Sequence, residues 1–421
     1  MKRLRTLYAA LWLICLGLAL FASVSPQSAN AQTTTPTATP TISAVNNVVI
    51  WWPAAIYPDE DSTALALLNQ YVARYQREQD VQVTIRVKRT EGTGSIYSTL
   101  SHASIVAPSV VPDLALMRRA DLLAAANDSL LAPIDLTALA MDDLFAGSLR
   151  LGDVDGTQYG IPFLVDAQHS VYRRNAFEQQ PQTLAQVLEA GQSFIFPANG
   201  AHGINSTVLT QYLSMGGRLA DDQNAPVLDE APLATVFTYY ETAVKRALIT
   251  TAWLDYANPE QYFGTSTGGK ATLWLVNATN YLSIFSTDTN NLAYSPLPTL
   301  TDAKTSVASV DGWMWVVTAN DPTQRQQALN MMRWLMDSDR HGAFSSNLGW
   351  LPSRRSSLEA WHTNYGTFAQ TLLDEDAAPP LDMINPKVSA AMQAAFEDVL
   401  NGKMTAALAA QSAAAKIAQG N

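Results

Sequence analysis

The sequence has little cysteine, few basic side chains and no closely spaced histidines. One cysteine, Cys15, occurs in 421 residues, which excludes a disulfide scaffold and any zinc or iron–sulfur site built from cysteines. The 26 basic side chains against 37 acidic ones give a net charge of −11, which argues against a basic surface for nucleic acid. The five histidines show no metal-ligand spacing. We therefore expect no metal, no other cofactor and no nucleic-acid partner.

The length and the apolar content indicate a folded chain with more than one lobe. Hydrophobic residues make up 48% of the sequence, which is ordinary for a globular protein and excludes wholesale disorder. A single hydrophobic core rarely serves more than about 250–300 residues, so this chain is expected to form two lobes or domains.

The first 31 residues are typical of a cleaved export signal. Lys2, Arg3 and Arg5 precede an apolar run over residues 7–22, and Ala-Asn-Ala at 29–31 fits a cleavage site. A permanent membrane anchor is the alternative, but the apolar run is short for a spanning helix. The sequence therefore predicts a signal peptide over residues 1–31 and an exported protein, periplasmic or extracellular.

A segment rich in threonine and proline follows the signal. Residues 32–45 carry no charge and almost no apolar side chains, so they predict an extended tether or a glycosylated stalk. Cys15 follows Ile14 instead of a small residue and does not resemble a lipid-attachment site. Any membrane association would therefore use the N-terminal segment itself.

Hydrophobic periodicity predicts a mixed α/β fold. Residues 48–52 form an apolar strand, residues 62–78 an amphipathic helix and residues 81–87 an alternating strand, which together make a βαβ unit with parallel strands. Further elements are predicted as a strand over 112–117, helices over 120–126 and 184–190, a hairpin with arms 148–154 and 157–163, a helix capped by Asp321 and Pro322, and one alanine-rich helix over 389–418.

One motif suggests an enzyme, but its surroundings do not fit. Residues 264–268 match the G-x-S-x-G pattern of a nucleophile elbow around Ser266, which requires a strand before the serine and a helix after it. The flanking residues indicate the reverse order. Carboxylates are plentiful, yet nothing singles out two of them as an acid–base pair.

Tryptophans near glycine, proline or asparagine form the most distinctive feature. Indole faces suit the apolar faces of sugar rings, although core packing is the more common role of any one tryptophan. Because neighbouring strand residues face opposite ways, at most one of Trp51 and Trp52 can face a cleft, whereas Trp313 and Trp315 share a face.

Several motifs occur in a characteristic order over residues 46–415. The sequence letters are DGTQYGIPF at 155–163, VYRRNAF at 171–177, MGGRL at 215–219, GGKA at 268–271, DGWMW at 311–315 and LPSR at 351–354. Their order and spacing resemble those of the extracellular solute-binding proteins, family 1, which are the sugar-type, maltose-binding-protein-like receptors of ABC importers.

The resemblance implies an α/β, two-lobed periplasmic-binding-protein-like (type II) fold with mixed sheets and a hinge of crossing strands. The crossings are expected at residues 163–168, 294–300 and 348–352. The N-lobe would then comprise residues 46–165 plus 300–350, and the C-lobe residues 166–299 plus 351–421. A ligand in the cleft between the lobes would drive hinge closure.

The resemblance also implies a binding function without catalysis. The protein is expected to be a monomeric receptor that passes a small solute, above all a carbohydrate, to the membrane permease of an ABC importer; a secreted hydrolase of glycans or esters is the alternative. Asp166 stands where the family commonly has an acidic ligand contact. The expected ligand-binding residues are Asp166, Trp51, Trp52, Trp313, Arg118 and Asn280.

Two departures from the family pattern limit the expected size of the solute. Asn277, Thr279 and Asn280 stand where relatives often carry a tryptophan, and Met392 stands where an aromatic residue is common. Two stacking platforms would be missing, so a solute smaller than a maltodextrin fits better. The sequence leaves open the identity of the solute, the importer, the mode of retention at the membrane and which tryptophans face the cleft.

Overall fold

The computed structural model describes residues 46–263, 270–301 and 306–420. The predicted signal peptide and tether, residues 1–45, and the possible elbow at Ser266 lie outside this part of the chain. Within the described residues, no helix combines the length and the apolar character needed to cross a membrane.

The first βαβ unit is confirmed. Strand β1 (Asn47–Pro53) pairs in parallel with β2 (Gln82–Lys88), and helix α1 (Thr63–Gln79) connects them. The helix begins where the Ser62 hydroxyl accepts a hydrogen bond from the Leu65 amide. It ends at Asp80, whose backbone adopts the left-handed conformation.

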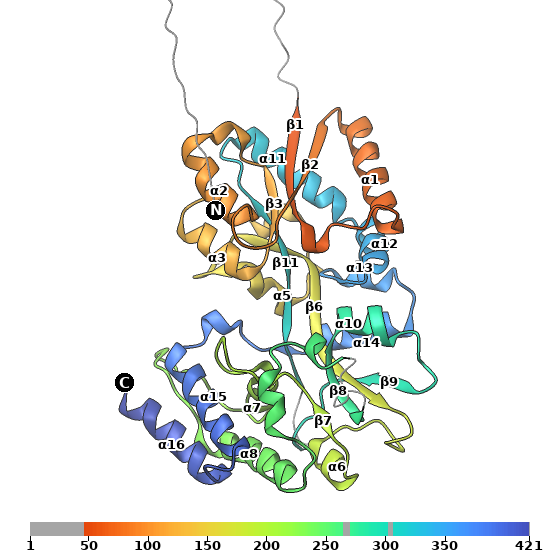
Figure 1. The fold of residues 1–421 in the computed structure, drawn as a ribbon. Coiled ribbons are helices and arrows are strands. Elements are labelled where there is room, and N and C mark those ends of the chain that lie inside the picture. Colours follow the sequence, from red (N-terminus) through yellow and green to blue (C-terminus); the bar gives the residue numbers. More distant parts are fainter. Residues whose placement is uncertain (1–45, 264–269, 302–305, 421) are drawn as a thin grey trace, which may run out of the picture. The chain divides into compact units, whose positions relative to one another are not determined.

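One mixed sheet runs through the described chain. Its main order is β2-β1-β3-β11-β6-β8-β7, with β9 and β12 also paired to β6. Strands β1, β2 and β3 are parallel, whereas β11 is antiparallel to both β3 and β6. Figure 1 shows β6 and β11 running beside each other from the group of β1–β3 toward the group of β7–β9. The remaining bounds are β3 (Leu114–Met117), β6 (Gly160–Arg173), β7 (Phe194–Ile195), β8 (Leu273–Asn277), β9 (Leu292–Ser295), β11 (Val310–Val317) and β12 (Leu351–Pro352).

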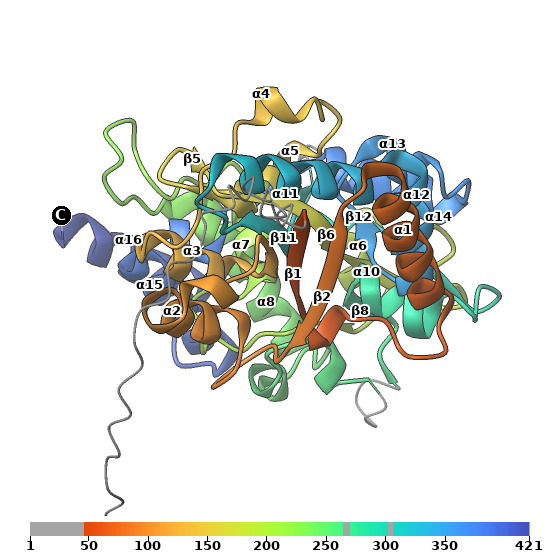
Figure 2. The ribbon, with the colours of Figure 1, turned by 90° about the horizontal axis from the view of Figure 1, so that it is seen from above.

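Helices cover both faces of the part of the sheet that contains β1, β2 and β3. Figure 2 shows α2 and α3 on one side of β1, and α1 with α12 on the other. Two buried clusters correspond to these faces, one centred on Trp52 and Trp315 and the other on Trp51 and Met117. The bounds of the helices are α2 (Ile96–Val106), α3 (Arg119–Asn127), α4 (Leu136–Leu139), α5 (Ala146–Leu149), α11 (Pro322–Leu335), α12 (Ser338–Leu348) and α13 (Arg355–Glu359).

A third buried cluster contains the side chains of β7, β8 and the helices around them. It also includes residues from α14, α15 and α16 near the C-terminus. The chain therefore returns to this cluster after contributing β11, α11 and α12 to the others. The bounds here are α6 (Leu184–Glu189), α7 (Ser206–Ser214), α8 (Glu230–Lys245), α10 (Ala278–Asn280), α14 (Asn364–Asp374), α15 (Pro386–Leu400) and α16 (Ala406–Gln419).

Side chains cap the starts of α6 and α11, and the predicted cap at Asp321 is confirmed. Thr183 and Gln186 form a capping box at the start of α6, with the Thr183 hydroxyl accepting from the Gln186 amide. The Asp321 carboxylate accepts hydrogen bonds from the first turn of α11, and Pro322 occupies the first helical position, where its missing N–H costs nothing.

Three predictions about elements were wrong in part. The hairpin is restricted to β4 (Asp153–Val154) and β5 (Thr157–Gln158), because residues 148–152 are helical. The helix predicted over 389–418 is divided into α15 and α16, since Gly402 has a φ of +66° and Thr405 caps the second helix. The crossing predicted at residues 294–300 does not fit the packing, because these residues remain in the cluster around β8.

A buried arginine connects α3 to distant segments. The Arg119 guanidinium donates two hydrogen bonds to the Asp382 carboxylate, with Nε–Oδ1 at 2.7 Å and Nη2–Oδ2 at 2.6 Å. Its Nη1 also donates to the carbonyl oxygens of Arg150, Leu151 and Asp153. Asp382 precedes α15, so this one side chain holds together three segments that are far apart in sequence.

Candidate functional site

Two aspartates lie opposite each other where β6 and β11 pair. The antiparallel register places Asp311 beside Asp166 and Trp313 beside Leu164. Residues in such positions point to the same face with Cβ atoms about 4.5–5.5 Å apart. Between them, a Cβ atom at Gly312 would lie 2.4 Å from the Leu164 carbonyl oxygen, so glycine permits the close approach of the strands. The crossing therefore presents two neighbouring carboxylates.

Asp166 is held by Thr279, which lies two positions after the end of β8. The Thr279 hydroxyl donates to Asp166 Oδ2 at 2.6 Å, and the Thr279 amide donates to Oδ1 at 3.2 Å. Burial raises the pKa of Asp166 to about 6, and the nearby charge of Asp311 adds to this increase, while the bonds from Thr279 oppose it. The carboxylate is thus fixed in position and incompletely hydrated.

A second polar pair lies two residues farther along β6. Gln168 shares the face of Asp166, and its Oε1 accepts a hydrogen bond from the Ser206 hydroxyl at 2.8 Å. Ser206 is the first residue of α7, whose N-terminus is capped by Asn205. The face of the crossing strands therefore carries carboxylate, amide and hydroxyl groups, which can all bind the hydroxyl groups of a solute.

Arg118 and Trp313, which are both predicted ligand-binding residues, lie next to each other. The Arg118 guanidinium carbon is 4.8 Å from the centre of the Trp313 ring. Arg118 is exposed, whereas Trp313 is 2% exposed and belongs to the same buried cluster as Trp52 and Trp315. Trp313 lies on the same face of β11 as Asp311. Among the predicted aromatic site residues, Trp313 is the one on β11, two positions from Asp311.

The structure gives Trp51 and Trp52 packing roles instead of an open face toward a solute. The two side chains point to opposite faces of β1, as the alternation predicts, but helices cover both faces. Trp52 is fully buried against Trp315, Phe163 and Phe344. Trp51 is 1% exposed, and Lys88 Nζ lies 4.3 Å from its ring centre.

Asn280 is occupied by structural hydrogen bonds. Its Nδ2 donates to Glu260 Oε1, and its Oδ1 accepts from the Asn277 amide at the start of α10. The neighbouring Thr279 makes the contact with Asp166 instead. Met392, which replaces an aromatic residue common in relatives, is fully buried.

Thr279, Gln168 and Asp311 were not found by sequence reasoning. A signal existed for Asp311, because it begins the DGWMW motif, and for Gln168, because it alternates with Asp166 along one strand. Only the register of β6 and β11 identifies Asp311 as the neighbour of Asp166. Among the described residues, no group of three or more metal-ligating side chains comes together.

The fold of the described residues is that of the two-lobed periplasmic binding proteins. The chain belongs to the bacterial extracellular solute-binding proteins, since the model of that family matches residues 70–370. Members of this family are exported binding proteins. No curated protein sequence matches this chain.

Solved structures of sugar-binding proteins share this fold at low sequence identity. The cyclic α-maltosyl-1,6-maltose binding protein of Arthrobacter globiformis is 17% identical with a TM-score of 0.68, over 88% of this chain and 97% of that one. The sugar-binding protein MalE of Xanthomonas citri is 16% identical with a TM-score of 0.68, over 89% and 97%. A solute-binding protein of Thermotoga lettingae bound with α-D-tagatose is 15% identical with a TM-score of 0.62, over 89% and 99%.

Proposed function

We propose that this protein is an extracytoplasmic receptor that binds a small carbohydrate and delivers it to the permease of an ABC importer. The observation that carries the proposal is the cross-strand pair of Asp166 and Asp311 beside the Trp313 indole. Carboxylates accept hydrogen bonds from sugar hydroxyl groups, and an indole face packs against the C–H face of a sugar ring. Similar structures that bind maltose or tagatose agree with this ligand class.

Asp166 is proposed as the main polar contact. Thr279 uses one hydrogen bond to each carboxylate oxygen, which leaves further acceptor positions on both oxygens for hydroxyl groups of the solute. Asp311 supplies a second carboxylate directly opposite. The missing stacking platform at residues 277–280 favours a solute of one or two sugar rings over a maltodextrin.

Arg118 is proposed to move when the solute binds. Its guanidinium covers the Trp313 ring, so a sugar can pack against that indole only when the arginine side chain rotates away. The displaced guanidinium then becomes a donor for ring or hydroxyl oxygens of the solute. This exchange would give Arg118 and Trp313 a joint role in recognition.

The lobes are proposed to follow the buried clusters. Buried apolar residues up to Leu164, apart from Phe145, and from Trp313 to Phe344 pack in the clusters around β1. Phe145 and the buried residues from Val165 to Ala308 and from Leu351 onward pack in the cluster around β8. The proposed hinge consists of β6, β11 and β12, where the chain passes between the clusters. Solute contacts made from both sides would drive closure.

The remaining features of the proposal concern location and assembly. Residues 1–31 direct export and residues 32–45 act as a spacer. The receptor either stays close to the membrane through its N-terminal segment or diffuses freely. The receptor works as a monomer and catalyses no reaction.

A ligand screen tests the proposed function. The full chain is melted in the presence of mono- and oligosaccharides, polyols and amino acids, and co-purified compounds are identified by mass spectrometry. A ligand at 100-fold excess over its Kd adds about 2.7 kcal/mol of stability, which gives a clear shift in Tm. We expect a saturable shift with a small carbohydrate that is reduced at least tenfold in affinity by Asp166→Asn.

A matched control uses Asp59, which is exposed and lies outside the site. Asp59→Asn makes the same change of charge and should leave the affinity unchanged. Equal affinities of the wild type and Asp166→Asn would remove Asp166 from the site. A shift only with amino acids, or sugar turnover without a saturable shift, would contradict the carbohydrate-receptor function.

A further inference from the structure

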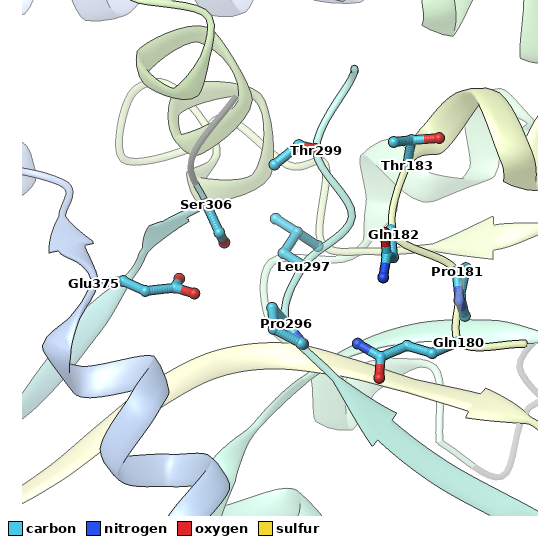
Figure 3. Close-up of a pocket in the computed structure, with 9 residues that line it drawn as sticks. All are labelled: Gln180, Pro181, Gln182, Thr183, Pro296, Leu297, Thr299, Ser306 and Glu375. Carbon is cyan, nitrogen blue, oxygen red and sulfur yellow. The ribbon is translucent and has the colours of Figure 1, made fainter. Parts of the chain in front are cut away.

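The structure contains a polar cavity that the crossing-strand aspartates do not line. It has a volume of about 270 Å³. Figure 3 shows the residues that line it: Gln180, Pro181, Gln182, Thr183, Pro296, Leu297, Thr299, Ser306 and Glu375. None of these residues belongs to the candidate site described above.

Two pairs of segments form the walls of this cavity. On one side, the Thr299 amide donates to the Gln182 carbonyl oxygen and the Leu184 amide donates to the Thr299 carbonyl oxygen. On the other side, Ser306 and Glu375 directly precede β10 (Val307–Ala308) and β13 (Asp376–Ala377), which pair in parallel. Backbone hydrogen bonds therefore hold both walls, so the cavity is built into the fold.

Glu375 supplies the charge in the cavity. Its Oε2 atom is buried and has no hydrogen-bond partner among the described residues. Burial raises the pKa of the carboxyl group, and a hydrogen bond from Ser306 opposes this effect. A buried acceptor without a partner carries a free-energy penalty that a hydrogen-bond donor from a ligand would remove.

The other lining groups favour a ligand that both donates and accepts hydrogen bonds. Figure 3 shows the amides of Gln180 and Gln182 directed into the space from the side opposite Glu375. Each amide offers donors and an acceptor, and none of the described lining residues is basic. An anion would therefore be repelled by Glu375, and a simple alkylammonium ion would offer the amide N–H groups no acceptor.

The size and the apolar walls narrow the ligand further. Pockets that hold drug-sized ligands have volumes of about 300–1,000 Å³, so a cavity of 270 Å³ limits the ligand to a single sugar ring or less. Pro181, Pro296 and Leu297 add apolar surface that suits the C–H face of such a ring. We infer that this cavity is a second binding site, specific for a neutral monosaccharide-sized polyol, with Glu375 as its principal acceptor.

The test separates this site from the crossing-strand site. The full chain carrying Asp166→Asn is titrated calorimetrically and by ligand-observed NMR with D-glucose, D-galactose, D-mannose, D-xylose and glycerol. At least one of these should bind with one-to-one stoichiometry. Adding Glu375→Gln should weaken that binding at least tenfold, because the amide replaces a charge-assisted acceptor by a neutral one.

The control is Asp376→Asn, which makes the same change of charge on the next residue. Asp376 is exposed and is not part of the cavity wall, so its replacement should change the affinity less than twofold. Gln182→Ala provides a second variant at the exposed rim and should weaken binding several-fold without changing the Tm of the free protein.

Three results would overturn the inference. One is that none of the five neutral probes binds the Asp166→Asn protein. Another is that Glu375→Gln leaves the binding unchanged. The third is that D-glucosamine or butylamine binds more tightly than D-glucose, which would make the cavity a cation site. A failure of the proposed function at the crossing-strand site would have a different result. The wild type and Asp166→Asn would then bind oligosaccharides with equal affinity.

Discussion

Replacing Asp166 by asparagine should make the free protein more stable at neutral pH while it weakens ligand binding. Burial and the neighbouring Asp311 raise the pKa of Asp166 from 3.8 to about 6. The folded state then binds more protons than the unfolded state between about pH 4 and pH 6. The free energy of unfolding therefore decreases as the pH rises through this interval, and the loss is nearly complete about one pH unit above the folded-state pKa.

The size of the effect follows from the shift in pKa. Two pKa units correspond to about 3 kcal/mol, which is the cost of ionising Asp166 in the folded protein at pH 7.5. The asparagine side chain avoids this cost but accepts weaker hydrogen bonds from Thr279, which removes about 1 kcal/mol of the gain. We expect a net gain of about 2 kcal/mol at pH 7.5 and no gain below pH 4.

Thermal unfolding measures this difference. For the unit Val45–Asn421, an unfolding entropy of about 2.1 cal/mol/K per residue converts 2 kcal/mol into an increase in Tm of about 2–3 °C. The wild type, Asp166→Asn and the surface control Asp59→Asn are compared at pH 4 and pH 7.5 without ligand. The reasoning fails if Asp166→Asn is no more stable than the wild type at pH 7.5, or if its gain is the same at both pH values.

Three further outcomes are expected. Carbohydrate affinity should fall as the pH drops through about 6, approaching tenfold per pH unit, because protonation removes an acceptor at Asp166; calorimetry at pH 7.5 and pH 4.5 measures this. Arg119→Ala should lower the free energy of unfolding by about 3 kcal/mol in denaturant titrations, since it leaves Asp382 and three carbonyl groups without their donor. His341 is fully buried and its pKa is lowered to about 3, so stability should fall as the pH drops below 6.5 because the unfolded state binds the extra proton, and His341→Asn should reduce this slope.

Each of these outcomes has a result that contradicts it. Affinity that is independent of pH between 7.5 and 4.5 would mean that the charge of Asp166 does not contact the solute. A loss below 1 kcal/mol in Arg119→Ala would mean that water replaces the guanidinium donor at Asp382 and at the three carbonyl groups without cost. Equal slopes of stability against pH in the wild type and His341→Asn would place the responsible proton on another group.

The local elements were predictable because they depend on short stretches of sequence. The alternation of residues 81–87 and the helical spacing of residues 62–78 are enough for β2 and α1. Asp321 followed by Pro322 likewise marks the start of α11. The break between α15 and α16 was missed because the alanine-rich segment has high helix propensity on both sides of Gly402.

The site was only partly predictable because it depends on which strands become neighbours. Asp166 could be proposed from its position in the family pattern, but its partner Asp311 is 145 positions away and is identified by the register of β6 and β11. The burial of Trp51 and Trp52 depends on helices that cover both faces of β1. Alternation within one strand says which side chains share a face and not what covers that face.

The length of β6 has a consequence for how the protein opens. One part of this strand pairs with β11 and β12, and the other part pairs with β8 and β9. Neither the clusters around β1 nor the cluster around β8 can therefore unfold without breaking backbone hydrogen bonds to β6. The amide hydrogens of residues 160–173 should be among the slowest in the chain to exchange with solvent deuterium, and at nearly one common rate along the whole strand.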